Sequence, residues 1–321
     1  MKIAIFSAAT RSSRAGNWVT TSRWKKLLRS AGHPTSVLHH LEEIDGCDAE
    51  VLIGLHARRS SQALIRFKKL FPNRTSIVAL TGTDLYRDLA PTKSRHPALA
   101  VRALDECRRI VLLQPLMAKR LKKRWQKKSR VVMMDVSSKS QPKRKSPTGK
   151  LKVCVVGHMR FEKDSLRAAM AVRLPSGTIE VTHVGDALTE SLQQRAKRES
   201  DQNANWNWRG SVSYAAVQAL MKRSDLLVNS SRIEGAPNVL FEALSLRLPI
   251  IASKIDGHVG ILGEDYGGYF KVGDTVGLRK LLLRCSQEPN FYRRLAETSD
   301  RIAKKYKPGN EVKALLDAIL S

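Results

Sequence analysis

The stretch Lys152-Val-Cys-Val-Val156-Gly157-His158-Met-Arg160-Phe-Glu-Lys163-Asp164 joins a short apolar run to a glycine and a charged loop. A run of this length that ends at glycine predicts a buried strand followed by a tight turn. Short apolar runs alternate with longer amphipathic segments in both directions along the 321-residue chain. This alternation predicts βαβ units and mostly parallel sheets that are covered on both faces.

The N-terminal half contains six predicted strands and four predicted helices. The strands are expected over 3–9, 35–39, 51–55, 76–80, 109–113 and 131–136. The helices are expected over 16–29, 60–71, 98–107 and 117–126.

The pattern starts again in the C-terminal half. Strands are expected over 152–156, 178–184, 205–209, 226–230, 249–252 and 269–272. Helices are expected over 165–173, 187–198, 214–223, 239–246, 275–285, 290–306 and 311–320, with a short element at 260–262.

A change in composition separates the two halves. The segment Ser137 to Lys150 has two prolines, a glycine and no large apolar residue, which is typical of a linker. We therefore expect an α/β protein with two doubly wound, Rossmann-like domains that face a central cleft. The predicted limits are 1–138 for the first domain, 139–150 for a basic linker and 151–300 for the second domain. We leave open whether the terminal helices, 301–321, pack back on the first domain.

Charge and cysteine content restrict the class of protein. The formal charge of +28 excludes an acidic solvating protein and favours anionic partners such as nucleic acid, an anionic membrane or phosphorylated ligands. The four cysteines are widely spaced and form no C-x-x-C pair, so free thiols in a reducing cytosol are expected. The first apolar run is too short for an export signal, and no run reaches the ~18 residues of a membrane span. The expected location is the cytoplasm.

Two acids lie eight residues apart in Asn229-Ser-Ser-Arg-Ile-Glu234-Gly235-Ala236-Pro237-Asn238-Val-Leu-Phe-Glu242. Proline favours the first helical position, so a helix is expected to begin at Pro237 with Ala236 at its cap. Ala236 has no side-chain acceptor, and the first N–H groups are therefore available to a phosphate. Glu234 would accept hydrogen bonds from sugar hydroxyls, and Glu242 from a ribose diol. The simpler alternative is two solvated acids near a helix start.

Two cations follow the glycine turn of the opening stretch. Arg160 and Lys163 lie beyond a predicted strand end, where ligands bind in doubly wound folds. The planar guanidinium and the compact ammonium complement each other on a diphosphate. A solvated charged loop is the alternative interpretation.

Polar loops also follow three strands of the N-terminal half. Gly16 and Asn17 open a helix whose N-terminus is expected to face the cleft. Two further loops offer an anion-friendly wall for an acceptor, made of His56, Arg58, Arg59, Thr83, Asp84 and Arg87.

These residues resemble the retaining GT-B glycosyltransferases that carry an E-x7-E motif. Glu234 and Glu242 match the two acids, and Gly235 follows the first of them. Lys163 stands six residues after Gly157, as the phosphate-binding lysine of that family does. The arginine that the family has directly after this glycine is His158 here, and Arg160 would take over its role.

Further stretches resemble one subgroup, the selenosugar synthases of bacterial selenoneine biosynthesis. They are Thr81-Gly-Thr-Asp-Leu-Tyr-Arg-Asp88, Leu55-His-Ala-Arg-Arg-Ser60, Val184-Gly-Asp-Ala-Leu188 and Gly257-His-Val-Gly-Ile-Leu-Gly-Glu-Asp-Tyr-Gly-Gly-Tyr-Phe270. The resemblance implies that a UDP-N-acetylhexosamine, with UDP-GlcNAc the first choice, reacts with selenophosphate. UDP leaves, phosphate is lost and a 1-seleno-sugar results.

The resemblance also implies roles for single residues. Glu234, Arg160 and Lys163 would be catalytic, with the two cations on the diphosphate. The arginine-rich wall would hold selenophosphate. The sugar nucleotide would contact Gly16, Asn17, Gly157, His158, Gly210, Val212, Gly235, Asn238 and Glu242, with the turn from Gly210 to Val212 at the uracil edge. No Asp-x-Asp pair is placed for a divalent ion, so the reaction is expected to need neither a metal nor another cofactor.

A basic segment, 119–150, is not explained by these motifs. Its cations would suit phosphate contacts on nucleic acid, but Trp125 is the only aromatic residue among them, which disfavours a stacking platform. Peripheral contact with an anionic membrane is the second alternative, and a solvated basic face without a partner is the third. A thiol, another sugar or a lipid remain alternative acceptors.

Overall fold

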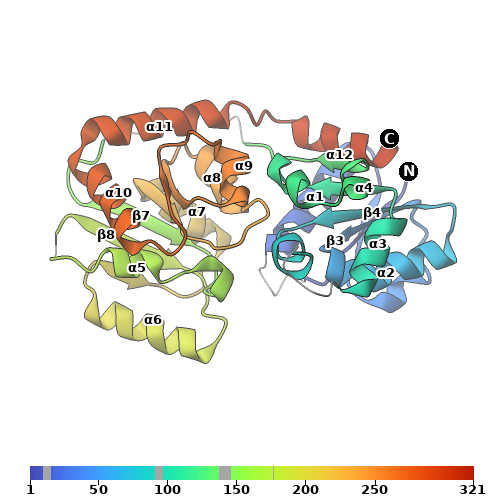
Figure 1. Cartoon of the computed structure of the whole chain (residues 1–321), viewed down its shortest axis with the longest axis horizontal. Coiled ribbons are helices and arrows are strands. Elements are labelled where there is room, and N and C mark those ends of the chain that lie inside the picture. The colour runs from blue at the N-terminus through green and yellow to red at the C-terminus, as the bar shows by residue number, and fades with distance from the viewer. Residues whose placement is uncertain (10–15, 91–96, 137–145, 176) are drawn as a thin grey trace. The chain divides into compact units, whose positions relative to one another are not determined.

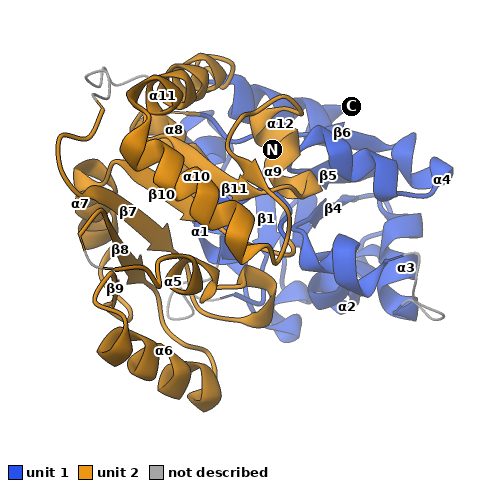
Figure 2. Ribbon diagram, turned by 60° about the vertical axis from the view of Figure 1, so that its left-hand side comes forward, with its two compact units in different colours: residues 1–135, 234–238, 308–321 blue, residues 136–233, 239–307 orange. Residues whose placement is uncertain are grey.

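The computed structural model describes residues 1–9, 16–90, 97–136, 146–175 and 177–321. The chain forms two compact units (Figure 2). Unit 1 comprises Met1–Asp135, Glu234–Asn238 and Pro308–Ser321, and unit 2 comprises Val136–Ile233 and Val239–Lys307. The predicted limits of the domains stay predictions, and most of the predicted linker, 139–150, lies outside the described residues.

Unit 1 is built on a six-stranded parallel sheet with the order β2-β1-β3-β4-β5-β6. Figure 1 labels β3 and β4 of this sheet. The strands are β1 (Ile3–Phe6), β2 (Thr35–Leu38), β3 (Val51–Leu55), β4 (Thr75–Leu80), β5 (Arg109–Leu112) and β6 (Ser129–Val131). The α-helices are α1 (Gly16–Ser30), α2 (Ala57–Leu70), α3 (Ala98–Glu106), α4 (Lys123–Gln126) and α12 (Asn310–Leu320). The 3₁₀ helices are η2 (Leu41–Ile44) and η4 (Pro115–Arg120), and η3 (Asp84–Asp88) is a π-helical turn.

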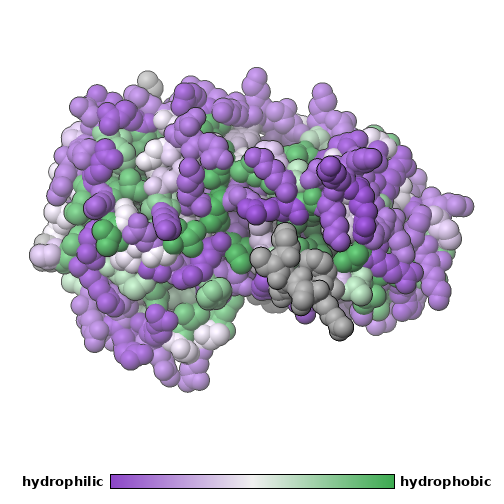
Figure 3. All heavy atoms as spheres, viewed as in Figure 1, coloured by the Kyte–Doolittle hydropathy of each residue, from purple (hydrophilic) through white to green (hydrophobic). Residues whose placement is uncertain are grey.

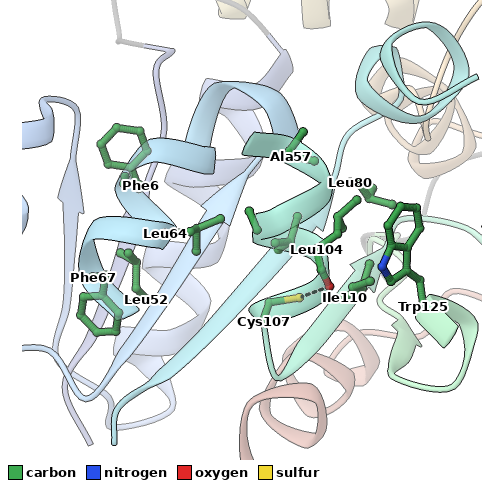
Figure 4. Packing of buried hydrophobic residues seen from close by; sticks show 14 of the residues in the cluster. Phe6, Leu52, Ala57, Leu64, Phe67, Leu80, Leu104, Cys107, Ile110 and Trp125 are labelled. Carbon is green, nitrogen blue, oxygen red and sulfur yellow. Dashed lines mark hydrogen bonds between the residues drawn. The ribbon is translucent and has the colours of Figure 1, made fainter. Parts of the chain in front are cut away.

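Apolar side chains cover both faces of this sheet, as the short apolar runs of the sequence predict. On one face, helices α2 and α3 contribute Leu64, Phe67 and Leu104 to a cluster with Leu52 and Trp125 (Figure 4). On the other face, side chains of α1 and α12 pack against the strands. The carboxyl ends of the paired strands β3 and β4 therefore lie side by side at the same edge of the sheet.

The last helix of unit 1 is held by a buried carboxylate. Glu311 accepts hydrogen bonds from Arg23 Nε at 2.6 Å, from Trp24 Nε1 at 3.0 Å and from the Asp135 backbone N–H at 3.0 Å. Asp135 in turn accepts from the backbone N–H groups of Gly309 and Glu311. These contacts place α12 in unit 1.

Two predicted elements of unit 1 are wrong. The single basic helix expected over 117–126 is split into η4 and α4, because Leu121 and Lys122 have extended backbones. The break lets the Trp125 indole donate to Asp105 at 2.7 Å. The strand expected over 131–136 is β6, which is shorter and begins two residues earlier.

Unit 2 contains a second parallel sheet of six strands, with the order β12-β11-β10-β7-β8-β9. The strands are β7 (Leu151–Val156), β8 (Ile179–Val184), β9 (Trp206–Trp208), β10 (Leu226–Asn229), β11 (Ile250–Ser253) and β12 (Tyr269–Phe270). The helices are η5 (Phe161–Lys163), α5 (Arg167–Ala171), α6 (Glu190–Gln202), α7 (Tyr214–Arg223), α8 (Asn238–Ser245), α9 (Asp256–Leu262), α10 (Thr275–Gln287) and α11 (Pro289–Ala303). The short element expected at 260–262 is the end of α9.

The surface agrees with the composition. On the face drawn in Figure 3, hydrophilic side chains cover much of the surface and smaller apolar areas lie between them. None of the described helices combines the length and the hydropathy needed to cross a lipid bilayer. The two sheets with their helices confirm the predicted α/β, GT-B architecture of two Rossmann-like folds.

Candidate functional site

Three glycines end three neighbouring strands of unit 2 in a row. Gly157, Gly185 and Gly210 follow β7, β8 and β9, and all three have positive φ angles. The Gly185 N–H donates to the Gly210 carbonyl at 2.7 Å, and a Cβ on Gly185 would overlap the Gly157 carbonyl. The three turns are therefore in backbone contact, at the sheet edge where doubly wound folds bind ligands. We call these residues the glycine row.

The two predicted phosphate cations lie on the loop that leaves this row. Lys163 folds back over Gly157, because a Cβ on Gly157 would lie 4.0 Å from the Lys163 Nζ. Arg160 is 41% exposed, and its Nε lies 3.9 Å from Glu162 Oε2. The loop thus presents an ammonium and a guanidinium beside a backbone that carries no side chain, an arrangement suited to a diphosphate.

Contacts with the loop after β10 fix the conformation of this cationic loop. The Glu162 carbonyl accepts from the Arg232 backbone N–H at 2.7 Å, and Ser230 Oγ donates to the Asp164 carbonyl at 3.0 Å. The Asp164 carboxylate accepts from Arg167 Nε at 2.9 Å. The cations are therefore mounted on a backbone tied to two strands, which limits the reorganisation that ligand binding costs.

His158 stands where the related family has an arginine. Its side chain is 24% exposed, and its Nδ1 accepts from the Asp186 backbone N–H at 3.0 Å. The proton of the neutral ring is therefore on Nε2. The ring ties the turn after β7 to the turn after β8. Val212, the far end of the predicted uracil turn, is half-buried and lies two residues after Gly210.

Helix α8 carries the second acid of the E-x7-E pair. It begins at Asn238, one residue after the start expected at Pro237 and one residue before the apolar run expected over 239–246, so that Pro237 and not Ala236 directly precedes it. Glu242 lies in the second turn, as expected, and is half-buried. Its Oε2 accepts from Gln218 Nε2 of α7 at 3.2 Å. The sequence analysis missed this orienting amide, because nothing in the spacing connects α7 with α8.

Within unit 1, several predicted sugar-nucleotide residues lie together. Gly16 begins α1, and its carbonyl accepts from Asn238 Nδ2 at 3.4 Å. A Cβ on Gly235 would lie 2.5 Å from the Thr81 carbonyl oxygen, so only glycine fits there. Asn17 is half-buried next to Gly16, and Glu234, which is also half-buried, precedes Gly235. The polar loop expected before Gly16 lies outside the described residues.

Asp84 is a structural anchor. Its carboxylate is fully buried and accepts backbone N–H groups from Ala57, Thr81, Gly82 and Leu85 at 2.8–3.0 Å. All of these donors lie in the two segments that follow β3 and β4, with Ala57 at the start of α2 and Leu85 in η3. The expectation that Asp84 faces an acceptor therefore conflicts with its burial, because the folded loops turn this side chain inward.

His56 connects the same two loops. It is buried with φ 74°, caps α2 by accepting the Arg59 backbone N–H on Nδ1, and contacts Thr83 Oγ1 through Nε2 at 3.1 Å. Burial lowers the pKa of His56, although the Asp84 carboxylate opposes this shift. The ring is neutral at neutral pH, and Nδ1 is the acceptor, so Nε2–H donates to Thr83. The Thr83 hydroxyl can then donate its own proton to a ligand.

The three arginines of the predicted wall are partly balanced by a carboxylate that the sequence analysis missed. Asp88 is buried and lies 3.1 Å from Arg87 Nε and 3.7 Å from Arg58 Nη1. Arg58 is 60% exposed and Arg87 41% exposed, and Arg59 is exposed as well. These loops still carry an excess of positive charge, because they contain three guanidinium groups and the two carboxylates Asp84 and Asp88.

Comparisons with known proteins agree with this architecture. The sequence matches the family "Glycosyl transferases group 1" over residues 136–301, slightly more than half of the chain. "Glycosyltransferase 1 domain-containing protein 1" of Xenopus tropicalis is 25% identical over 325 residues, which cover 94% of this chain and 92% of that protein.

Solved structures are similar over the whole chain. A glycosyltransferase from Rickettsia africae has a TM-score of 0.76 at 13% identity, covering 99% of this chain and 97% of that one. Anabaena HepE in complex with UDP and glucose has a TM-score of 0.73 at 15% identity, covering 100% and 98%. At these identities the similarity establishes the fold alone.

The chain belongs to the group 1 glycosyl transferase family, and it is a glycosyltransferase with the GT-B fold. The roles assigned to single residues stay predictions.

Proposed function

We propose that the selenium of selenophosphate attacks C1 of a UDP-bound N-acetylhexosamine and releases UDP, and that water then cleaves the Se–P bond, which releases phosphate and leaves a 1-seleno-sugar. The observation that carries the donor half is Lys163 folded over Gly157 at the end of β7, beside Arg160. A diphosphate is the ligand chemistry that this arrangement favours. The Anabaena HepE structures are described with UDP and with UDP-glucose, which supports the same donor class here.

In this proposal the donor side works by electrostatics. The bond between C1 of the sugar and the UDP oxygen breaks, and negative charge develops on the leaving diphosphate. Arg160 and Lys163 stabilise that charge, and the loss of one comparable donor costs about 3–4 kcal/mol of transition-state stabilisation. Glu242, oriented by Gln218, would bind the ribose diol. Glu234 would bind the sugar hydroxyls.

The acceptor half rests on unit 1 and on the sequence resemblance. Selenium in selenophosphate is already anionic, so its attack on C1 needs no strong base. Arg58, Arg59 and Arg87 would hold the trianion-like acceptor, and Thr83 would donate a hydrogen bond to it. The Asp88 carboxylate partly neutralises the charges of Arg58 and Arg87. We therefore expect binding of the acceptor to depend most on Arg59.

The setting and the cofactor requirement are part of the proposal. The four cysteines are buried free thiols, and burial raises the pKa of Cys107 to about 11 and that of Cys285 to about 12. Such thiols are unreactive and fit a reducing cytoplasm. We propose that the transfer needs no metal or further cofactor.

The acceptor assignment is tested by steady-state kinetics of UDP release with selenophosphate as the varied substrate. Arg59→Gln should raise the KM for selenophosphate about tenfold, because charge-assisted hydrogen bonds to the acceptor are lost. It should leave the dissociation constant of UDP within twofold. Arg66→Gln is the matched control, since Arg66 lies on the same helix but pairs with Asp45. An unchanged KM for Arg59→Gln would contradict the acceptor site. If the enzyme turns over with a thiol, a sugar or a lipid but not with selenophosphate, that compound is the acceptor instead.

A further inference from the structure

His183 is a fully buried histidine directly behind the glycine row. It lies on β8, where Ile179 and Val181 share its buried alternation. Its Nε2 lies 3.0 Å from the Gly157 carbonyl oxygen. A carbonyl only accepts, so Nε2 carries the proton and Nδ1 is bare. Burial lowers the pKa of His183 to about 4, in agreement with a neutral ring.

A role in packing alone does not account for this histidine. Its Nδ1 is buried and has no hydrogen-bond partner among the residues that the structure describes. An aliphatic residue would continue the row of Ile179 and Val181 without this unsatisfied nitrogen, whose burial is unfavourable. What an aliphatic residue cannot supply is the N–H that Gly157 accepts.

The hydrogen bond orients the peptide that joins Gly157 to His158. His183 holds the oxygen edge of this peptide, and Gly185 packs against its face, where a Cβ would overlap it. In a trans peptide the C=O and N–H groups point in opposite directions. The backbone N–H of His158 is therefore directed away from His183, on the side of the turn opposite the strand that carries the imidazole.

We propose that His183 is a positioning residue for the diphosphate turn, which it holds so that the His158 backbone N–H binds the diphosphate of the donor. The inference rests on the proposed UDP-sugar donor and adds a backbone donor to Arg160 and Lys163. Trp208 supports the neighbouring turn in the same manner, because its Nε1–H donates to the Gly185 carbonyl at 2.8 Å.

The test compares binding of UDP with binding of uridine, which lacks the diphosphate. His183→Met removes the donor at similar length, whereas His183→Gln keeps an N–H near the position of Nε2. His183→Met should weaken the binding of UDP about tenfold, as expected for the loss of one hydrogen bond to a charged group. It should weaken the binding of uridine less than twofold. Gln should recover most of the loss.

Trp206→Phe is the control for packing. Trp206 touches the His183 ring with centroids 6.0 Å apart, and its buried Nε1 has no partner among the described residues. The substitution perturbs the packing around His183 without removing a polar contact, so the ratio of the UDP affinity to the uridine affinity should not change. An altered ratio in Trp206→Phe, or no advantage of Gln over Met, would reduce His183 to a packing residue.

A measurement on the wild-type protein does not depend on whether the variants fold. The amide resonance of His158 in a ¹H–¹⁵N spectrum should shift when UDP binds and should shift much less with uridine. Equal shifts, or none with UDP, would overturn the positioning role while the UDP site stands. Failure of the wild type to bind UDP by calorimetry would instead overturn the proposed function, and the inference with it.

Discussion

Replacement of Asp84 by asparagine separates a structural role from an acceptor-binding role. The buried carboxylate accepts four backbone N–H groups from the two loops after β3 and β4. An amide has only one acceptor oxygen, and its NH₂ group would face donors. About two charge-assisted hydrogen bonds are lost, each contributing ~1.5–3 kcal/mol. We therefore expect Asp84→Asn to destabilise unit 1 by about 4 kcal/mol.

Differential scanning calorimetry checks this prediction. For a unit of this size, about 4 kcal/mol corresponds to a decrease in Tm of roughly 8–16 °C. Asp45→Asn is the control, because Asp45 is 48% exposed in its pair with Arg66 and exposed pairs contribute at most about 1 kcal/mol. UDP affinity, measured below the transition, should stay within twofold. If Asp84→Asn melts like the wild type but raises the KM for selenophosphate, Asp84 is an acceptor ligand and not a structural anchor.

Three further predictions concern the donor site. Glu242→Ala should weaken UDP binding by about tenfold or more in calorimetry, because the ribose loses a charged acceptor. Glu234→Ala should leave UDP binding unchanged and slow sugar transfer. Wild-type turnover of both variants would contradict the assignment. Burial lowers the pKa of His183 from 6.5 to about 4, so its contribution to stability is complete above about pH 6.5 and is lost as the pH falls toward 4, by about 3 kcal/mol in total. Urea unfolding at several pH values should show a smaller loss for His183→Gln, and equal losses would refute this origin. EDTA should leave the rate of UDP release unchanged, and a rate restored by Mg²⁺ or Mn²⁺ after chelation would contradict metal independence.

Local patterns predicted the fold because each strand and helix is defined by its own residues. The runs at 51–55 and 214–223 coincide with β3 and α7. The basic segment around Leu121 was mispredicted, because helical spacing of Met117, Leu121 and Trp125 also fits two short helices joined by an extended break.

The site was predictable only where its parts are adjacent in sequence. Lys163 and Gly157 are six residues apart, and the structure places them in contact. Asp84 follows a strand end like a ligand, but its carboxylate also accepts from the backbone N–H of Ala57, which is 27 residues away in the sequence. His183 looks like an interruption of an apolar strand, because its partner Gly157 lies in the turn after the neighbouring strand β7.

We propose that a UDP-N-acetylhexosamine reacts with selenophosphate. The most direct test measures UDP release from UDP-GlcNAc, with and without freshly prepared selenophosphate, together with mass detection of the sugar product. We predict UDP release that depends on selenophosphate and a product with the mass of a 1-seleno-N-acetylhexosamine. UDP release at the same rate without selenophosphate, or a product without selenium, would contradict the account.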